Sequence, residues 1–126
     1  MENRFPALFF SLSVIGLLLI YVSAGKTEAK TVGISGIDAS MVGFYVETTG
    51  YVESADFAES KISVKLSDGY ETVNVVVFSD LRAALGDTGA LFSEGSVISV
   101  RGVVDEYKGV IEIIPNRVSD IRRLGR

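Results

Sequence analysis

Residues 95–115 read Gly-Ser-Val-Ile-Ser-Val-Arg-Gly-Val-Val-Asp-Glu-Tyr-Lys-Gly-Val-Ile-Glu-Ile-Ile-Pro. This stretch predicts two strands joined by a tight turn: Val97–Asp105 is rich in β-branched residues, Tyr107-Lys108-Gly109 forms the turn, and Val110–Ile114 returns. Gly102 interrupts the first strand, and a glycine inside a strand marks a bulge or a sharp bend. Because a small closed barrel needs such bends at its corners, the stretch indicates a β-barrel.

The composition of the chain excludes several classes of enzyme. Among its 126 residues there is no cysteine and no histidine. Disulfide frameworks, thiolate metal sites, cysteine nucleophiles and histidine-based triads or zinc sites are therefore excluded. We expect a non-enzymatic protein without metal or cofactor. The formal net charge of −4 is unfavourable for tight binding to a phosphate backbone, which rewards lysine and arginine.

The N-terminus carries a long apolar segment. No charged residue occurs from Phe5 to Gly25, a length that can span a bilayer core as a helix. We interpret residues 1–25 as a transmembrane anchor or a signal segment. Val22-Ser23-Ala24 resembles a cleavage site, but the length favours an uncleaved single-pass anchor. The flanking positive charges are nearly balanced, and the very short N-terminal tail favours an extracytoplasmic domain.

The rest of the chain divides into a juxtamembrane linker over residues 26–40 and a barrel over residues 41–126. The first strand is predicted from Val42 to Glu53, with Val42, Phe44 and Val46 facing inward and a bulge at Gly50. A polar loop is expected over residues 54–60.

Two more strands and a helix follow in the prediction. Lys61–Ser67 alternates between apolar and polar residues, Asp68-Gly69 is a hairpin signal, and Thr72–Phe78 is the partner strand. A helix is expected over 79–86, capped by Ser79 or Asp80 and ended by Gly86. Arg117–Leu124 is compatible with a short helix or with a continuing strand.

This order of elements resembles the oligonucleotide/oligosaccharide-binding (OB) fold of the anticodon-binding and single-strand-binding type. The resemblance rests on Val42-Gly43…Val46…Gly50-Tyr51-Val52, on Leu66-Ser-Asp-Gly, and on residues 97–109, and it covers residues 32–124. It implies an all-β, five-stranded Greek-key barrel with a short helix between strands three and four. It also implies a non-enzymatic binding module: a membrane-held domain for single-stranded nucleic acid, or an extracytoplasmic adaptor for a protein or small ligand, as in exported bacterial stress proteins of this fold.

In this fold, ligands lie across strands two and three, between the loops that join strands one–two and four–five. Single-strand binding needs exposed aromatic rings for stacking and basic side chains for the backbone. An alternative interpretation is that Lys61 and Lys65 pair with Glu47 and Glu53 across the sheet. Loop carboxylates such as Asp105, Glu106, Asp56 and Glu59 are expected to be solvated rather than to bind calcium, because their spacing does not fit a calcium loop. The candidate ligand-binding residues are Tyr45, Tyr51, Lys61, Lys65, Asn74, Phe78, Arg101, Tyr107 and Lys108.

Overall fold

The computed structural model describes residues 28–125. The predicted membrane segment, residues 1–25, lies outside the described residues. Within residues 28–125, no helix is long and apolar enough to cross a membrane.

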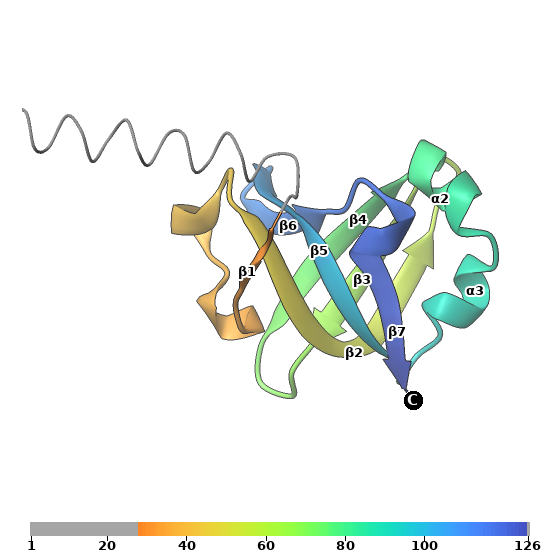
Figure 1. Ribbon diagram of the computed structural model, residues 1–126, viewed down its shortest axis with the longest axis horizontal. Helices are drawn as coiled ribbons and strands as arrows, with labels where there is room; N and C mark the ends of the chain where they lie inside the picture. Colours follow the sequence, from red (N-terminus) through yellow and green to blue (C-terminus); the bar gives the residue numbers. More distant parts are fainter. Residues whose placement is uncertain (1–27, 126) are drawn as a thin grey trace, which may run out of the picture.

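Five strands close into a barrel (Figure 1). The strands are β2 (Tyr45–Phe57), β3 (Lys61–Ser67), β4 (Thr72–Phe78), β5 (Val97–Tyr107) and β6 (Val110–Ile114). Each is antiparallel to its neighbour except β4 and β6, which pair in parallel, and the pairing of β2 with β5 closes the ring. This confirms the all-β five-stranded barrel predicted from the sequence.

Short helices and strands are added to the five-stranded barrel. Helices α2 (Ser79–Leu85) and α3 (Thr88–Leu91) connect β4 to β5, as Figure 1 shows. Strand β1 (Lys30–Thr31) pairs in parallel with β2, and β7 (Ile121–Gly125) pairs with β5. Residues 28–125 also contain three 3-10 turns: η1 (Ile34–Gly36), η2 (Ala39–Met41) and η3 (Val118–Asp120). Ile34 and Ile37 lie in the core, so residues 30–40 pack against the barrel.

The barrel interior is aliphatic because β-branched side chains alternate inward along each strand. Ile62, Val64 and Leu66 of β3 are fully buried, as their alternation predicted, and Val73, Val75 and Val77 of β4 join them. Phe92, after α3, is also fully buried in this cluster.

Two glycines permit the tight curvature of the barrel. A Cβ on Gly50 would lie 2.6 Å from the carbonyl oxygen of Ser67, and one on Gly102 would lie 2.7 Å from the backbone of Ile114. Both positions are therefore restricted to glycine by close backbone approach. At Gly102 the register between β2 and β5 runs on without a bulge, and the close approach of Ile114 accounts for the glycine. The predicted bulge at Gly50 is wrong, because the register between β2 and β3 shifts between Val52 and Ser54.

The first strand begins and ends later than predicted. Strand β2 continues through residues 54–57, which were expected to be a polar loop, because these residues pair with residues 62–65 of β3. At its other end, Val42 and Phe44 are exposed rather than inward, since they precede the strand at a turn where Gly43 has φ +91°. Only Val46 of the three predicted inward residues is buried.

The β3–β4 turn lies where the sequence predicts it, but the β5–β6 turn is shorter than predicted, because Tyr107 belongs to β5 and pairs with Val110. Asp68 accepts hydrogen bonds from the backbone N–H groups of Tyr70 and Glu71, which closes the β3–β4 turn. Lys108 and Gly109 both have positive φ, as a two-residue β5–β6 turn requires. The predicted capping by Ser79 or Asp80 is wrong, because the N-cap of α2 is Phe78, without a side-chain hydrogen bond.

Candidate functional site

A hollow of about 300 Å³ lies on the outer surface of the barrel, between the β2–β3 loop (residues 58–60) and the β5–β6 turn. We call it the cleft. The predicted β3–β4 face and both flanking loops meet there, which is the arrangement expected for ligand binding in this fold. The cleft is lined by Ser60, Lys61, Val76, Phe78, Asp105, Tyr107, Glu112 and Ile114.

Apolar and aromatic groups form part of the cleft lining. The neighbours of Val76 in β4, Val75 and Val77, point into the barrel, so the Val76 side chain lies on the outer side of the sheet. It is nevertheless only 1% exposed. Phe78 and Tyr107 are 49% and 53% exposed, which leaves a large part of each side chain accessible to a planar ligand. Such a surface can stack a flat ring without selecting its identity.

Two ammonium groups accompany the ring of Tyr107. Lys61 Nζ lies 5.7 Å from the ring centroid and Lys108 Nζ lies 5.3 Å from it, both within cation–π range. Because lysine has a long and flexible stem, an incoming ring can replace either ammonium group on Tyr107.

A row of polar residues crosses the sheet next to the aromatic groups. Lys65 of β3 pairs with Asn74 of β4, which pairs with Glu112 of β6, which pairs with Asp105 of β5. Lys65 also lies 4.0 Å from Glu53, so the predicted cross-strand ion pair forms there. The row therefore offers donors at one end and carboxylate acceptors at the other.

The surroundings of the cleft are more acidic than basic. Among the charged residues that line the cleft, Lys61 stands against Asp105 and Glu112, and the strands and loops around it add more carboxylates than lysines, so the cleft does not form a strongly positive groove. The cleft therefore offers aromatic surfaces and hydrogen-bonding groups rather than a strong positive field. With the lining residues included, the lysines are Lys61, Lys65 and Lys108, and the carboxylates belong to Glu53, Asp56, Glu59, Asp105, Glu106 and Glu112.

Two predicted site residues, Tyr45 and Arg101, lie instead around a buried carboxylate. The Asp120 side chain is 1% exposed and accepts a hydrogen bond from the Tyr45 hydroxyl at 2.7 Å. Its other oxygen accepts from the backbone N–H groups of Asn116 and Arg117, each at 3.0 Å. Arg101 Nε lies 3.8 Å from the carboxylate. This network fastens η3 onto β2 and β5.

The same network shifts the ionisation of its members. Burial raises the pKa of Asp120, but the hydrogen bonds from Asn116, Tyr45 and Arg117 outweigh it, so the pKa lies below its usual value. Burial and the hydrogen bond to Asp120 raise the pKa of Tyr45. Asp120 is thus a stable anion and Tyr45 a stable phenol at neutral pH. Both are suited to holding the fold together.

The remaining predicted residue, Tyr51, lies where β2 passes from β5 to β3, paired with both Val97 and Ser67. It does not line the cleft. The structure thus brings Lys61, Phe78 and Tyr107 into the cleft lining, with Lys108 beside Tyr107 and Lys65 and Asn74 in the adjoining row.

Sequence reasoning missed Glu112, Val76 and Ile114 of the cleft. The signal for Glu112 was present, because a two-residue turn pairs Tyr107 with Val110 and thereby Asp105 with Glu112. Val76 and Ile114 carried no such signal, because the sequence alone does not tell whether an apolar residue on the outer side of a strand lines a hollow or is covered by another element.

Comparisons with known proteins agree with this geometry. A family described as "OB-fold nucleic acid binding domain" matches residues 46–121. No curated protein sequence matches the chain significantly.

Three solved structures illustrate the structural likeness. OBody AM1L10, in a structure bound to hen egg-white lysozyme, is 28% identical with a TM-score of 0.66, covering 79% of this chain and 98% of that chain. The Stn1–Ten1 complex of S. pombe gives 18% identity and a TM-score of 0.64, covering 78% of this chain and 79% of that chain. Asparaginyl-tRNA synthetase from Pyrococcus horikoshii gives 17% identity and a TM-score of 0.62, covering 78% of this chain and 24% of that chain. The last two show the fold alone.

The family match spans more than half of the chain and includes all five barrel strands. The chain belongs to the family of OB-fold nucleic acid binding domains.

Proposed function

We propose that the protein is a non-enzymatic module that binds single-stranded nucleic acid in the cleft. The observation that carries this proposal is the half-exposed ring of Tyr107, which lies beside the hollow with two lysine ammonium groups within 6 Å. A nucleotide needs a flat surface for its base and a positive charge for its phosphate. Family membership supports the same function.

In this proposal, a base stacks on Tyr107 and displaces one lysine from the ring. The released ammonium group of Lys61 or Lys108 then lies next to the phosphate of the same nucleotide. Glu112 and Asp105 are acceptors, so they favour bases that present amino or imino donors toward the sheet. The lysines supply affinity and the carboxylate row supplies a preference among bases.

The test removes the ring of Tyr107 and compares the loss of binding with that caused by removing the ring of a tyrosine far from the cleft. Tyr107→Ala should weaken binding of a fluorescent single-stranded oligonucleotide by roughly 5- to 150-fold, because stacking contributes about 1–3 kcal/mol per base. Tyr70, which is 95% exposed at the opposite end of the β3–β4 hairpin, provides the control variant Tyr70→Ala. Fluorescence anisotropy at low salt measures both. Equal effects of the two variants, or no binding by the wild-type chain, would contradict the proposal.

We further propose that the uncharged segment Phe5–Gly25 holds the domain at a membrane as a single-pass anchor. This proposal rests on the sequence, because a segment of this length without charge suits a bilayer core. Membrane pellets washed with alkaline carbonate should retain the full chain. Release of the chain into the carbonate supernatant would contradict the anchor.

A second candidate function is an extracytoplasmic adaptor that binds a protein or small ligand in the same cleft. The observation that favours it is the excess of carboxylates around the cleft, which suits a cationic partner. OBody AM1L10 shows that a related barrel can hold a protein. A compartment-specific reporter fused after Arg126 separates the two functions. A domain outside the cytoplasm favours the adaptor, and a cytoplasmic domain favours nucleic acid.

A further inference from the structure

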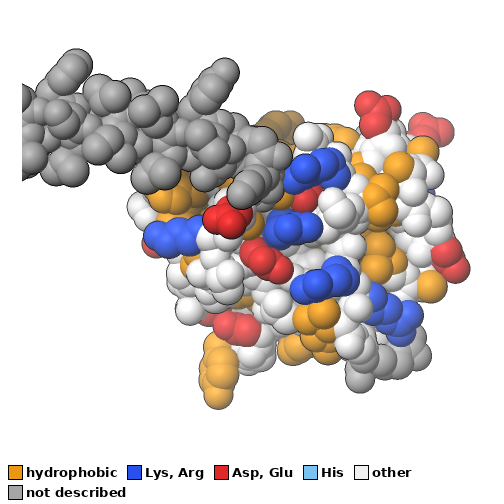
Figure 2. All heavy atoms as spheres, in the orientation of Figure 1, with side chains coloured by type: hydrophobic (Ala, Val, Ile, Leu, Met, Phe, Trp, Pro, Cys, Tyr) orange, Lys and Arg blue, Asp and Glu red, His pale blue; other side chains and the backbone are white. Residues whose placement is uncertain are grey.

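A second hollow, of about 260 Å³, lies on the side of the barrel formed by β2, β5 and β7. We call it the arginine hollow. Figure 2 shows Lys and Arg side chains gathered on this face of the molecule. The lining is entirely polar and consists of Glu47, Ser99, Arg101, Ser119, Asp120 and Arg122.

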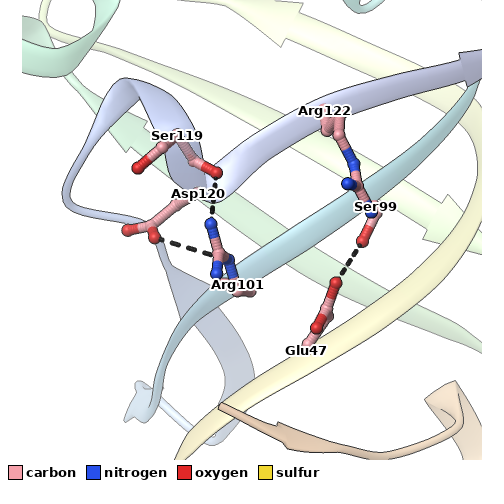
Figure 3. Close-up of a pocket in the computed structure, with 6 residues that line it drawn as sticks. All are labelled: Glu47, Ser99, Arg101, Ser119, Asp120 and Arg122. Atoms are coloured by element: carbon pink, nitrogen blue, oxygen red, sulfur yellow. Dashed lines mark hydrogen bonds and ion pairs between the residues drawn. The ribbon is translucent and has the colours of Figure 1, made fainter. Parts of the chain in front are cut away.

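Its two arginines differ in how they are held. Arg101 Nη2 donates to the carbonyl oxygen of Ser119 at 2.7 Å and Arg101 Nε faces Asp120, so the guanidinium is fixed in place (Figure 3). Arg122 is paired in register with Ser99 and lies across it in the close-up. Within residues 28–125 it makes no hydrogen bond or ion pair through its side chain. One guanidinium that is fixed, and one that has no partner among residues 28–125, thus face the same hollow.

The charge balance of the hollow matches a monoanion. Asp120 is buried and lies 3.8 Å from both Arg101 Nε and Arg117 Nη2. Glu47, the other carboxylate, accepts a hydrogen bond from Ser99 Oγ at 2.9 Å. The three arginines, Arg101, Arg117 and Arg122, and these two carboxylates sum to one positive charge, which complements the single negative charge of a phosphodiester. Guanidinium groups also suit phosphate because they donate in a planar fork.

A third hollow adjoins both the cleft and the arginine hollow through shared lining residues. This hollow, of about 320 Å³, shares Ile114 with the cleft and Asp120 with the arginine hollow. Its lining includes Tyr45, Val103 and Arg117. A ligand extending from the cleft therefore meets an apolar and aromatic stretch and then the arginines.

From these contacts we infer that a single strand bound in the cleft continues across β5, and that the arginine hollow binds one of its backbone phosphodiesters. This inference rests on the proposed function and extends its site. Along β5, Tyr107 at the cleft and Ser99 at the arginine hollow are separated by eight residues, or about 26 Å at strand spacing. At about 3.4 Å per stacked nucleotide, that distance corresponds to roughly eight nucleotides.

The test varies oligonucleotide length and one charge at a time. Single strands of four and ten nucleotides are titrated against the full chain in mild detergent, and anisotropy is measured over a range of salt. Arg122→Gln should weaken binding of the ten-nucleotide strand by about tenfold and lower its salt slope by about 0.7. Binding of the four-nucleotide strand should be unchanged. Glu47→Gln should strengthen binding of the longer strand, because it removes a like charge from the hollow.

Arg123→Gln is the matched control, because Arg123 is the adjacent exposed arginine of β7 but is paired with Ile98 rather than with Ser99. It should leave binding of both strands nearly unchanged. Equal losses for Arg122→Gln and Arg123→Gln would overturn the inference, as would equal losses for both strand lengths.

Failure of the inference can be told apart from failure of the proposed function. If the wild-type chain binds both strands but Arg122→Gln changes neither affinity, the inference is overturned and the cleft proposal stands. If the wild-type chain binds neither strand, the proposed function fails first. Binding to phosphatidylglycerol vesicles that depends on Arg122, without oligonucleotide binding, would assign the hollow to lipid phosphate and overturn its assignment to nucleic acid.

Discussion

Asp120→Asn is expected to destabilise the fold by about 1–2 kcal/mol at pH 7. The carboxylate accepts three hydrogen bonds, and its side chain is only 1% exposed. An asparagine keeps one acceptor oxygen for the two backbone N–H groups, but it places an amide where Tyr45 donates and removes the negative charge beside Arg101. Charge-assisted hydrogen bonds are roughly twice as strong as neutral ones, which sets the size of the loss.

Complete removal of the carboxylate should cost more. Asp120→Ala leaves two backbone N–H groups and the Tyr45 hydroxyl without this partner, and the expected loss is about 3–5 kcal/mol. Since a domain of this size is stable by only about 5–15 kcal/mol, that change removes a large share of its stability. Asp120→Asn is therefore the variant suited to measurement, and Asp120→Ala gives the upper limit of the loss in the free energy of unfolding.

The effect has a defined pH dependence. The pKa of Asp120 is lowered in the folded protein, so its stabilisation is complete above the ordinary aspartate pKa and is lost as pH falls through the lower folded value. The difference between wild type and Asp120→Asn should stay constant from pH 7 to about pH 5 and shrink below about pH 4.

Urea unfolding of the full chain in mild detergent measures this difference. Far-UV circular dichroism is the appropriate signal because the chain has no tryptophan. Asp56→Asn, an exposed aspartate of β2, is the control and should change the free energy of unfolding by less than about 0.5 kcal/mol. A loss below about 0.5 kcal/mol for Asp120→Asn, or a loss that does not change down to pH 2, would refute this account of the network.

Two further stability predictions follow from the barrel interior, and both use the same urea assay. Gly50→Ala should destabilise the protein by about 1–3 kcal/mol, because the added Cβ would lie 2.6 Å from the carbonyl oxygen of Ser67; an unchanged stability would show that β2 and β3 can separate there. Thr48→Val should stabilise the protein by about 1 kcal/mol, because the buried Thr48 hydroxyl has no hydrogen-bond partner among residues 28–125; a loss of stability would reveal such a partner.

The barrel could be predicted from the sequence because its strands carry strong local signals. The alternation in residues 61–67 and the Asp68-Gly69 turn signal indicate the inward face of β3 and its pairing with β4 without reference to distant contacts. The late start and end of β2 could not be predicted. Residues 54–57 are polar, and they form a strand only because β3 is available to pair with them. For the same reason, the position of Phe57 in a strand, with its ring exposed and Arg82 close to it, could not be predicted.

The candidate site was predictable where it follows from the fold. The resemblance to the OB fold placed Lys61, Phe78 and Tyr107 on the expected ligand face, and all three line the cleft. Tyr45 and Arg101 show the limit of that reasoning. Their internal partner is Asp120, which is 75 residues from Tyr45 in the sequence, and no local pattern indicates that contact.

The central claim is that a single strand binds in the cleft, and chemical-shift mapping tests it most directly. The isotope-labelled full chain in micelles is titrated with an unlabelled ten-nucleotide strand, and the backbone amide signals are followed. We expect the largest shifts at Lys61, Phe78, Tyr107 and Lys108, with smaller shifts at Arg101 and Arg122. Shifts confined to the Tyr70 turn, or no shifts at low salt, would contradict the claim and remove the cleft as the nucleic-acid site.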